Sequence, residues 1–322
     1  MKIAFIDNNP KMSKGSYRIH INDLSYYFNQ LGYESKINPS NLNHYDIFIH
    51  GKTKQPKFIK NKINGIITPN KDDIKILKIV NFIIVGSVEE KESLIEHNKN
   101  CFLFPQIEKM YSNVKPKIHS KKDKIIIGYH GNQNHLNHMS CGLKNALEKL
   151  NKKYNIELVF ICSNKDEWIQ GRPKIPTVFK KWNIKTIIND IKNFDIGIIP
   201  NISEFVMHNK LNNNNTLGKY NTDYMIRFKN KSNIGRALVL FQLGIPVVAD
   251  ITPSNMHILA NPDNGYAVLS EYGWYTAIQD LMDEDKRNFI SNNACEEYKR
   301  LYDPLKWAKS LLKNIEITSK IK

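Results

Sequence analysis

The sequence predicts an α/β protein made of two doubly wound domains, each a parallel sheet with helices on both faces. Two observations support this fold class. Short apolar runs rich in β-forming residues alternate with helical patterns along the whole chain, which is typical of parallel sheets covered by helices. The chain of 322 residues is also long enough for two compact domains of about 120–180 residues each.

The first domain is expected to span residues 1–118. A short strand at 2–7 opens it, and a polar loop then leads into a helix that ends at Gly32, the residue type that most often closes a helix. Ser87 and Glu90 form a capping box that begins another helix. Further strands of this domain are predicted at 46–50, 65–68, 82–86 and 101–104.

A stretch rich in lysine, proline and serine at 108–124 is predicted to link the domains. The second domain is expected at 119–303, followed by a helix at 304–322 that packs back towards the first domain. Pro304 stands at the first position of that helix, where its missing N–H would have no partner in any case. Strands are predicted at 125–131, 157–162, 195–199, 246–250 and 266–269, and helices at 271–283 and 285–300.

Composition favours a cytoplasmic protein. No apolar run approaches the roughly 18 residues that a membrane-spanning helix needs. The chain begins with a short strand-like run and not with a secretory leader. The four cysteines form no C-x-x-C pair, which favours free thiols in a reducing compartment.

The formal net charge of +16 favours anionic partners: nucleotide diphosphates, polyanionic acceptors or the acidic inner face of a membrane. Nucleic acid is not among the expected partners. The sequence has no zinc-finger spacing, no aromatic RNP-like strand and no basic region followed by heptads. The charge is therefore taken to favour a glycan acceptor and peripheral association with a membrane.

The segment 228–250 carries the most informative pattern: a basic, polar loop that opens a helix, then a glycine and a buried strand. Ser232 or Asn233 can cap the helix, whose free N–H groups then point at an anion. Cationic side chains where a diphosphate would lie are Lys229, Lys231 and Arg236. The alternative interpretation is a capped amphipathic helix with solvated lysines.

Together with the Asp-Ile-Gly-Ile-Ile-Pro run at 195–200, this segment resembles the C-terminal domain of GT-B glycosyltransferases of the glycosyltransferases group 1 superfamily. That family has a D-I-G-I-x-P-like strand, a donor-contacting helix and a G-x-P-V-V strand, here at 244–248. The turn His130-Gly131-Asn132 looks like the glycine turn that faces the donor diphosphate. Trp274 and the Asp-Lys-Arg run at 285–287 look like the closing helices, so the resemblance covers roughly residues 125–315.

The resemblance implies two Rossmann-like domains that face a cleft, with the donor on the C-terminal domain and the acceptor on the N-terminal one. The implied reaction moves a sugar from a nucleotide-sugar donor to a surface-polysaccharide or lipid-linked glycan acceptor. It needs no metal and no cofactor, because basic side chains and a helix dipole neutralise the leaving diphosphate.

One departure leaves the stereochemistry and the donor open. Retaining members of the superfamily often carry a pair of glutamates across this helix and its loop, and the nearest positions here are Ser232 and Val239. Ribose and sugar hydroxyls would then be held by other groups, with Ser232, Asn233 and Asp250 as candidates. A catalytically silent GT-B module that binds a nucleotide or a glycan stays an alternative, as does transfer of another phosphate-linked group.

In the first domain, the loop and helix after the opening strand would face the acceptor. His20 can serve as a general base, with Asp7 orienting it or acting itself. The alternative for His20 is an ordinary, partly exposed helix residue. Arg18 can bind a phosphate on the acceptor, and Ser16 and His50 are further acceptor-binding candidates.

Two clusters raise the question of a metal. His130, His135 and His138 have the spacing of no known zinc site, so a phosphate or sugar contact by His130 is expected instead. The Asp-Glu-Asp run at 283–285 matches the D-x-D signature of metal-dependent enzymes, but it lies between two helices and is expected to cap the second. Hydrolase, P-loop and dinucleotide motifs are missing from the sequence.

Overall fold

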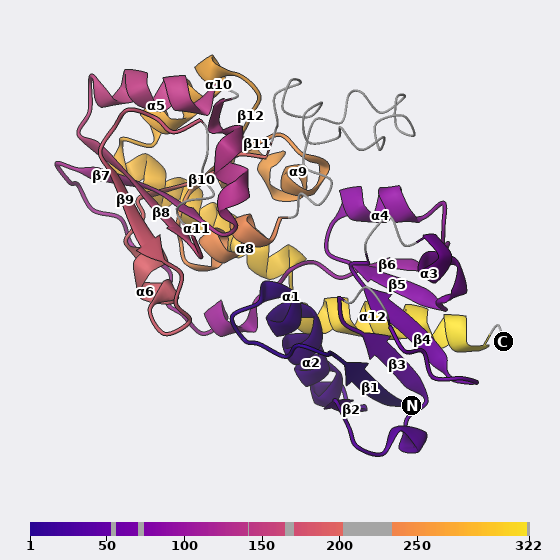
Figure 1. Ribbon diagram of the computed structural model, residues 1–322. Coiled ribbons are helices and arrows are strands. Elements are labelled where there is room, and N and C mark those ends of the chain that lie inside the picture. Colours follow the sequence, from indigo (N-terminus) through magenta and orange to yellow (C-terminus); the bar gives the residue numbers. More distant parts are fainter. Residues whose placement is uncertain (53–55, 70–73, 141, 165–170, 202–233, 321–322) are drawn as a thin grey trace. The chain divides into compact units, whose positions relative to one another are not determined.

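The computed structural model describes the chain except for residues 53–55, 70–73, 141, 165–170, 202–233 and 321–322 (Figure 1). The loop at 205–222 and the donor candidates Lys229, Lys231, Ser232 and Asn233 lie outside the described residues. The chain forms two compact units. The first comprises Met1–Ser112, Asn233–Gly235 and Lys299–Lys322, and the second comprises Asn113–Ser232 and Arg236–Tyr298.

The first unit is built on a parallel sheet of six strands in the order β2-β1-β3-β4-β5-β6. The order reverses between β1 and β3, so the carboxyl ends of these two strands form the switch point of the sheet. The strands are β1 (Lys2–Ile6), β2 (Glu34–Ile37), β3 (Ile47–His50), β4 (Ile63–Ile67), β5 (Phe82–Val85) and β6 (Cys101–Leu103).

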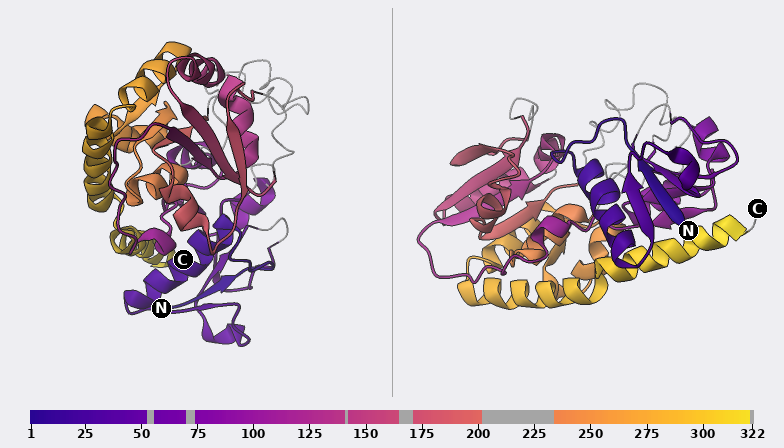
Figure 2. Two further views of the ribbon diagram at one scale, coloured as in Figure 1. Left: turned by 90° about the vertical axis from the view of Figure 1, so that its left-hand side faces the viewer. Right: turned by 90° about the horizontal axis from the view of Figure 1, so that it is seen from below.

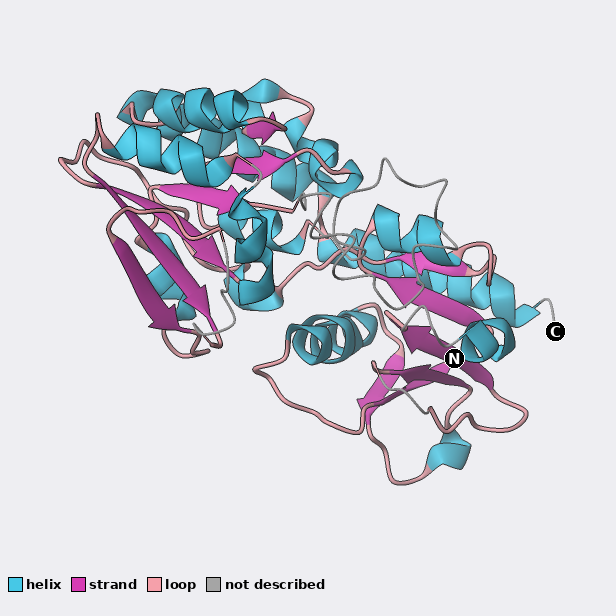
Figure 3. Cartoon of the chain, turned by 45° about the horizontal axis from the view of Figure 1, so that its top comes forward, coloured by secondary structure: helices cyan, strands magenta, loops and turns pink. Residues whose placement is uncertain are grey.

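Helices cover both faces of this sheet (Figures 1 and 3). One face packs against α2 (Leu24–Gln30) and the C-terminal helix α12 (Pro304–Lys320), and the other against α3 (Ile74–Ile79) and α4 (Val88–Leu94). Short turns complete the unit: α1 (Gly15–Tyr17), η1 (Arg18–Asp23), η2 (Leu42–His44) and η3 (Lys109–Tyr111).

The C-terminal helix belongs to the first unit because of one apolar stripe. Ala308, Leu311, Leu312 and Ile315 recur at helical spacing and are buried with Phe28 of α2 in a single cluster. Figure 2 shows α12 running along the first sheet. The division of function between an acceptor domain and a donor domain stays a prediction.

The helix predicted to follow the first strand is interrupted by a π-helical segment, η1, before α2 begins. A π-helical turn widens the helix by one residue and shifts the face on which later side chains lie. Arg18, His20 and Asp23 all become buried in this segment. The helix ends at Gln30 with Leu31 as its C-cap, and Gly32 follows with a φ of +86°, as predicted for a closing glycine.

The second unit is also a parallel sheet of six strands, in the order β12-β11-β10-β7-β8-β9. The order reverses between β7 and β10, and outside the carboxyl ends at such a point doubly wound sheets bind their ligands. The strands are β7 (Ile125–His130), β8 (Ile156–Cys162), β9 (Thr177–Lys181), β10 (Ile196–Ile199), β11 (Val247–Asp250) and β12 (Tyr266–Val268).

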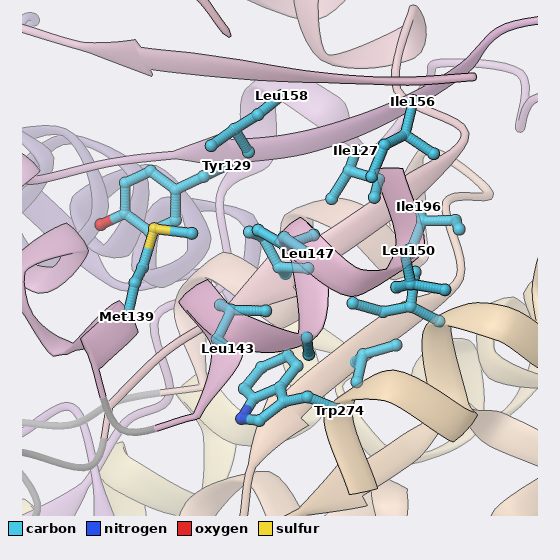
Figure 4. Packing of buried hydrophobic residues seen from close by; sticks show 14 of the residues in the cluster. Ile127, Tyr129, Met139, Leu143, Leu147, Leu150, Ile156, Leu158, Ile196 and Trp274 are labelled. Carbon is cyan, nitrogen blue, oxygen red and sulfur yellow. The ribbon is translucent and has the colours of Figure 1, made fainter. Parts of the chain in front are cut away.

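On one face of this sheet, α5 (Leu143–Asn151) and α10 (Glu271–Asp280) enclose the apolar cluster that Figure 4 draws. Trp274 and Leu147 lie within it, and Tyr129 lies at one end beside Met139 (Figure 4). The other helices and turns among the described residues are η4 (Gln133–Ser140), α6 (Ile187–Lys192), α8 (Gly235–Gln242), α9 (Pro253–Leu259), η6 (Pro262–Asn264) and α11 (Glu284–Leu301).

Helix α8 packs on the opposite face, where a strand glycine makes room for it. Any side chain at Gly197 of β10 would collide with Leu240 of α8. Val239, at the position where a family glutamate would stand, is 0% exposed in the apolar core. It therefore cannot hold a hydroxyl group of a ligand.

The stretch predicted as a linker is bound to the second unit from residue 113 onwards. Lys117 and Lys122 each donate to the same carboxylate oxygen of the buried Asp195, at 2.8 and 2.7 Å. Burial alone would raise the pKa of Asp195, but these two lysines and the Ile126 N–H outweigh it and the pKa is lowered. The motif aspartate of the 195–200 run therefore fixes this stretch to the sheet.

Three capping predictions are confirmed. The Ser87 hydroxyl accepts a hydrogen bond from the Glu90 N–H, and α12 begins at Pro304. Asp283 accepts from the Lys286 N–H at 2.9 Å, which makes the acidic run a cap of α11. Among the described residues, no helix is both long and apolar enough to cross a membrane.

Candidate functional site

The candidate donor site lies within the second unit, where the carboxyl ends of β7 and β10 meet. Gly131 follows β7 with a φ of +128°, a conformation that favours glycine. A Cβ there would lie 3.0 Å from the Cδ of Arg236, so the arginine side chain would have to shift by a few tenths of an ångström to make room. The predicted glycine turn and the predicted arginine of the α8 start therefore lie in direct contact.

Arg236 is the second residue of α8, and its guanidinium is surrounded by neutral groups. Its Nη2 donates to Asn201 Oδ1 at 3.0 Å and to His135 Nδ1 at 3.2 Å, and its Nη1 donates to the Tyr129 hydroxyl at 3.3 Å. No carboxylate of the described residues forms an ion pair with it. Its Nε is buried and has no hydrogen-bond partner among the residues that the structure describes.

His135 accepts from an arginine that can only donate, which places the proton of the neutral imidazole on Nε2. The site therefore brings a positive charge together with an imidazole, an amide and a phenol, and these neutral groups leave the charge uncompensated. The N-terminus of α8 adds the partial positive charge of the helix dipole. This arrangement suits an anion.

Asn201 follows β10 directly after Pro200 and is 0% exposed. Its backbone N–H donates to Asp250 Oδ2 at 2.5 Å, which ties it to the end of β11. The Asp250 carbonyl accepts in turn from Asn255 Nδ2 at 3.0 Å. Asp250, predicted to hold ligand hydroxyls, thus positions the residue that contacts Arg236.

Tyr129 connects the apolar core to the site. Its ring belongs to the buried cluster of Figure 4, while its hydroxyl donates to the Asn132 carbonyl at 2.6 Å and accepts from Arg236. Burial raises the pKa of Tyr129 to about 12, although Arg236 opposes the shift. The phenol is therefore protonated at neutral pH and can serve as this donor.

The other predicted residues of the turn have different surroundings. His130 is buried, and its Nε2 lies 3.2 Å from the Arg236 carbonyl, so it donates to the backbone of α8. Asn132 is exposed. Among the described residues, no group of three or more His, Cys, Asp or Glu side chains gathers that could hold a metal ion.

Sequence reasoning missed Asn201 and Tyr129 as members of this site, and considered His135 only as a zinc ligand. A signal for Asn201 is present in the sequence. It follows a buried strand at the same sheet edge as Gly131, but only the pairing of β7 with β10 shows that the two ends are neighbours.

In the first unit, Asp7 lies at the corresponding switch point. It follows β1, and its Oδ2 would lie 2.5 Å from a side chain built at Gly51, the residue after β3. Its backbone N–H donates to Asn38 Oδ1 at 2.9 Å, and its Oδ1 accepts from the Asn9 N–H at 2.7 Å. The carboxylate therefore sits at the sheet edge where a ligand of this unit would bind.

His20 is buried and only 1% exposed, so the alternative of an ordinary, partly exposed helix residue is wrong. The cause is the π-helical segment, which turns it towards Phe104 and Gly86. Neither ring nitrogen meets hydrogen-bond geometry. Burial lowers its pKa to about 4, with the Phe104 backbone partly opposing, so the imidazole is neutral at pH 7.

The predicted acceptor residues are dispersed. Arg18 donates through Nε and Nη2 to one oxygen of Glu108, at 2.8 and 2.6 Å, and through Nη1 to the Met12 carbonyl. An acceptor phosphate would therefore have to compete with Glu108. His50 is buried and paired with Asn64 at 3.1 Å, whereas Ser16 is exposed.

The sequence matches no family model, and no curated protein matches it. Solved structures do match. HepE from Anabaena, in complex with UDP and glucose, is 11% identical with a TM-score of 0.65, covering 98% of this chain and 99% of that chain. Sucrose-phosphate synthase from Thermosynechococcus elongatus is 10% identical with a TM-score of 0.67, covering 100% of both chains.

A third match is WaaG, a glycosyltransferase involved in lipopolysaccharide biosynthesis, which is 9% identical with a TM-score of 0.59 and covers 98% of this chain and 99% of that chain. At such low identity a structural match establishes the fold and leaves the activity to the site. The two parallel sheets of six strands with flanking helices, shared over the full length, show that this chain has the two-domain α/β fold of GT-B glycosyltransferases.

Proposed function

We propose that the protein is a glycosyltransferase that moves a sugar from a nucleotide-diphosphate sugar to a surface-polysaccharide or lipid-linked glycan. The observation that carries this proposal is Arg236, a guanidinium whose described partners are all neutral, at the switch point of the second sheet. The diphosphate is the negatively charged part of a nucleotide-sugar donor, and the positive charge of Arg236 would bind it. HepE, one of the structures with this fold, has been solved with UDP-glucose.

The leaving diphosphate develops negative charge as the sugar departs. Arg236 and the N-terminus of α8 lie where they can stabilise that charge, since fixed donors need no reorganisation at the moment of reaction. The proposed mechanism therefore uses no divalent cation. Lys229, Lys231, Ser232 and Asn233 are proposed to complete the donor site, together with Gly131 and the backbone of the His130–Asn132 turn.

The acceptor is proposed to bind the first unit at the β1 and β3 ends. Asp7 is the stronger candidate for the general base, because its carboxylate lies at the sheet edge while His20 is enclosed. His20 is neutral and able to take a proton, so it acts as the base only if acceptor binding opens a path to it. The net charge of +16 favours an acceptor at an acidic membrane surface, and we place the enzyme at the inner face.

A second candidate function is a catalytically silent module that binds a nucleotide or a glycan. The burial of Val239 favours it, because the family glutamate position has no polar side chain here. A GT-B transferase of another phosphate-linked group would use the same charge of Arg236.

A turnover assay separates these functions. The protein is incubated with UDP-, GDP- and CMP-sugars, and release of the free nucleotide is followed with and without a lipid-linked glycan. Release that rises with the glycan supports the glycosyltransferase. Nucleotide binding without any release supports the silent module, and the absence of binding to all nucleotides overturns the proposal.

A further inference from the structure

Two buried N–H groups of the proposed nucleotide-sugar site have no hydrogen-bond acceptor among the described residues. One is the Nε of Arg236 and the other is the Nδ2 of Asn201. The two side chains are joined by the 3.0 Å hydrogen bond from Nη2 to Oδ1. Buried donors are nearly always paired in folded proteins, so two neighbouring unpaired ones call for an acceptor.

The orientation of the Asn201 amide follows from its partner. A guanidinium has donors only, so the amide oxygen must face Arg236 and the amide nitrogen must point elsewhere. The residue has little freedom to change this arrangement, because its backbone N–H is held by Asp250 at 2.5 Å and its side chain is 0% exposed. The unpaired nitrogen is therefore a fixed feature of the site.

The charge around these donors selects the kind of acceptor. The described partners of Arg236 are the neutral side chains of Tyr129, His135 and Asn201. A neutral carbonyl would satisfy the geometry but would leave the arginine charge uncompensated. An anionic oxygen satisfies both, and a phosphoryl group offers several such oxygens to donors on two side chains.

We infer that Asn201 is a phosphate-binding residue, whose Nδ2 and the Nε of Arg236 donate to one phosphoryl group of the ligand. Asp250 acts as its positioning residue through the Asn201 backbone. The identification of that phosphoryl group as part of a nucleotide-sugar donor rests on the proposed function. The inference adds a residue from the β10 end to a site that the sequence places on α8 and the glycine turn.

Substitution of Asn201 tests this directly. Asn201→Asp keeps the shape but sets a carboxylate against Arg236, so the cation becomes paired internally. Asn201→Ala removes the donor without adding charge. Asn183→Asp makes the same charge change in an exposed turn, where the side-chain oxygen that accepts from the Lys185 N–H is retained. It serves as the matched control.

Dissociation constants are measured by calorimetry for UDP, GDP and inorganic pyrophosphate, with thermal melting of each ligand-free variant. We expect Asn201→Asp to weaken pyrophosphate and the tighter nucleotide by about 100-fold and Asn201→Ala by about 10-fold, with Asn183→Asp unchanged. Asn201→Ala also removes the Oδ1 that accepts from Arg236 Nη2, so it should melt below wild type. A single cooperative melting transition above the titration temperature shows that the variant is folded when its affinity is measured.

The outcomes separate the two proposals. If the wild type binds UDP or GDP and both Asn201 variants bind it equally well, the inference is wrong and the proposed function stands. If the wild type binds pyrophosphate through Asn201 but no nucleotide, the inference stands and the proposed function is wrong. If the wild type binds none of the three, both are overturned.

Discussion

Arg236 and Asn201 share a hydrogen bond of 3.0 Å although they come from different elements, one from the first turn of α8 and the other from the end of β10. The bond crosses the point where the strand order of the second sheet reverses. The Arg236 guanidinium of α8 therefore contacts the Asn201 amide at the end of β10, next to the Gly131 turn that follows β7. The following predictions test parts of this arrangement.

The contact between Gly131 and Arg236 predicts that Gly131→Ala weakens donor binding. The variant needs a non-glycine residue at a φ of +128° and places a Cβ 3.0 Å from the Arg236 side chain. The backbone strain alone costs roughly 1–3 kcal/mol of stability. Donor affinity, measured by calorimetry, should fall in addition.

Gly32→Ala is the control for that variant. Gly32 also has a positive φ, +86°, but an added Cβ meets nothing within 4 Å. It should lower the melting temperature while leaving donor affinity at the wild-type value. If both glycine variants lost affinity equally, the contact with Arg236 would not be the cause.

Two buried histidines predict a loss of stability in acid. Burial lowers the pKa of His20 and of His119 from 6.5 to about 4, partly opposed by backbone groups at Phe104 and Gly244. Between pH 6.5, the pKa in the unfolded chain, and about pH 4, the pKa in the folded chain, the unfolded chain binds protons that the folded chain does not. The free energy of unfolding therefore has its full value above pH 6.5 and declines as the pH falls towards 4. Each histidine accounts for roughly 3 kcal/mol over this window.

Urea unfolding of wild type and of His20→Leu at pH 7.5 and at pH 4.5 checks this prediction. The variant should lose less stability than wild type between the two pH values, because one of the two histidines is gone. Equal losses would show that His20 is not buried in its neutral form. At pH 7.5 the variant should be close to wild type in stability, since neither ring nitrogen meets hydrogen-bond geometry.

Metal removal is expected to leave donor binding unchanged. Arg236 and the N-terminus of α8 already supply positive charge at the proposed diphosphate position. Calorimetry after EDTA treatment, and again after Mg²⁺ or Mn²⁺ is added, should give dissociation constants within about twofold of each other. A donor that binds only when Mn²⁺ is present would contradict the assignment of Arg236.

Much of the fold follows from the sequence, because buried parallel strands appear as continuous apolar runs. The exceptions have physical causes. Strand β2, with the sequence Glu-Ser-Lys-Ile, lies at the sheet edge and has little apolar signal. The π-helical segment at Arg18–Asp23 departs from the regular helical period, so a regular helical pattern does not predict that His20 is buried.

The proposed donor site could be predicted only in part. Gly131 and Arg236 have local signals, a glycine turn after a strand and a cation at a helix start. Asn201 follows a buried strand, but that signal does not identify its role, which depends on which strand ends are neighbours and on the Asp250 carboxylate that holds its backbone. Chain order alone does not give that pairing.

Calorimetric titration of UDP and GDP into wild type, Arg236→Ala and the surface control Lys152→Ala tests the central claim most directly. Lys152 is an exposed residue at the end of α5, so its loss removes a charge without touching the site. The account predicts that one nucleotide binds wild type and the control equally, and that Arg236→Ala weakens it by about 100-fold. Equal binding by all three proteins would contradict a diphosphate site at Arg236.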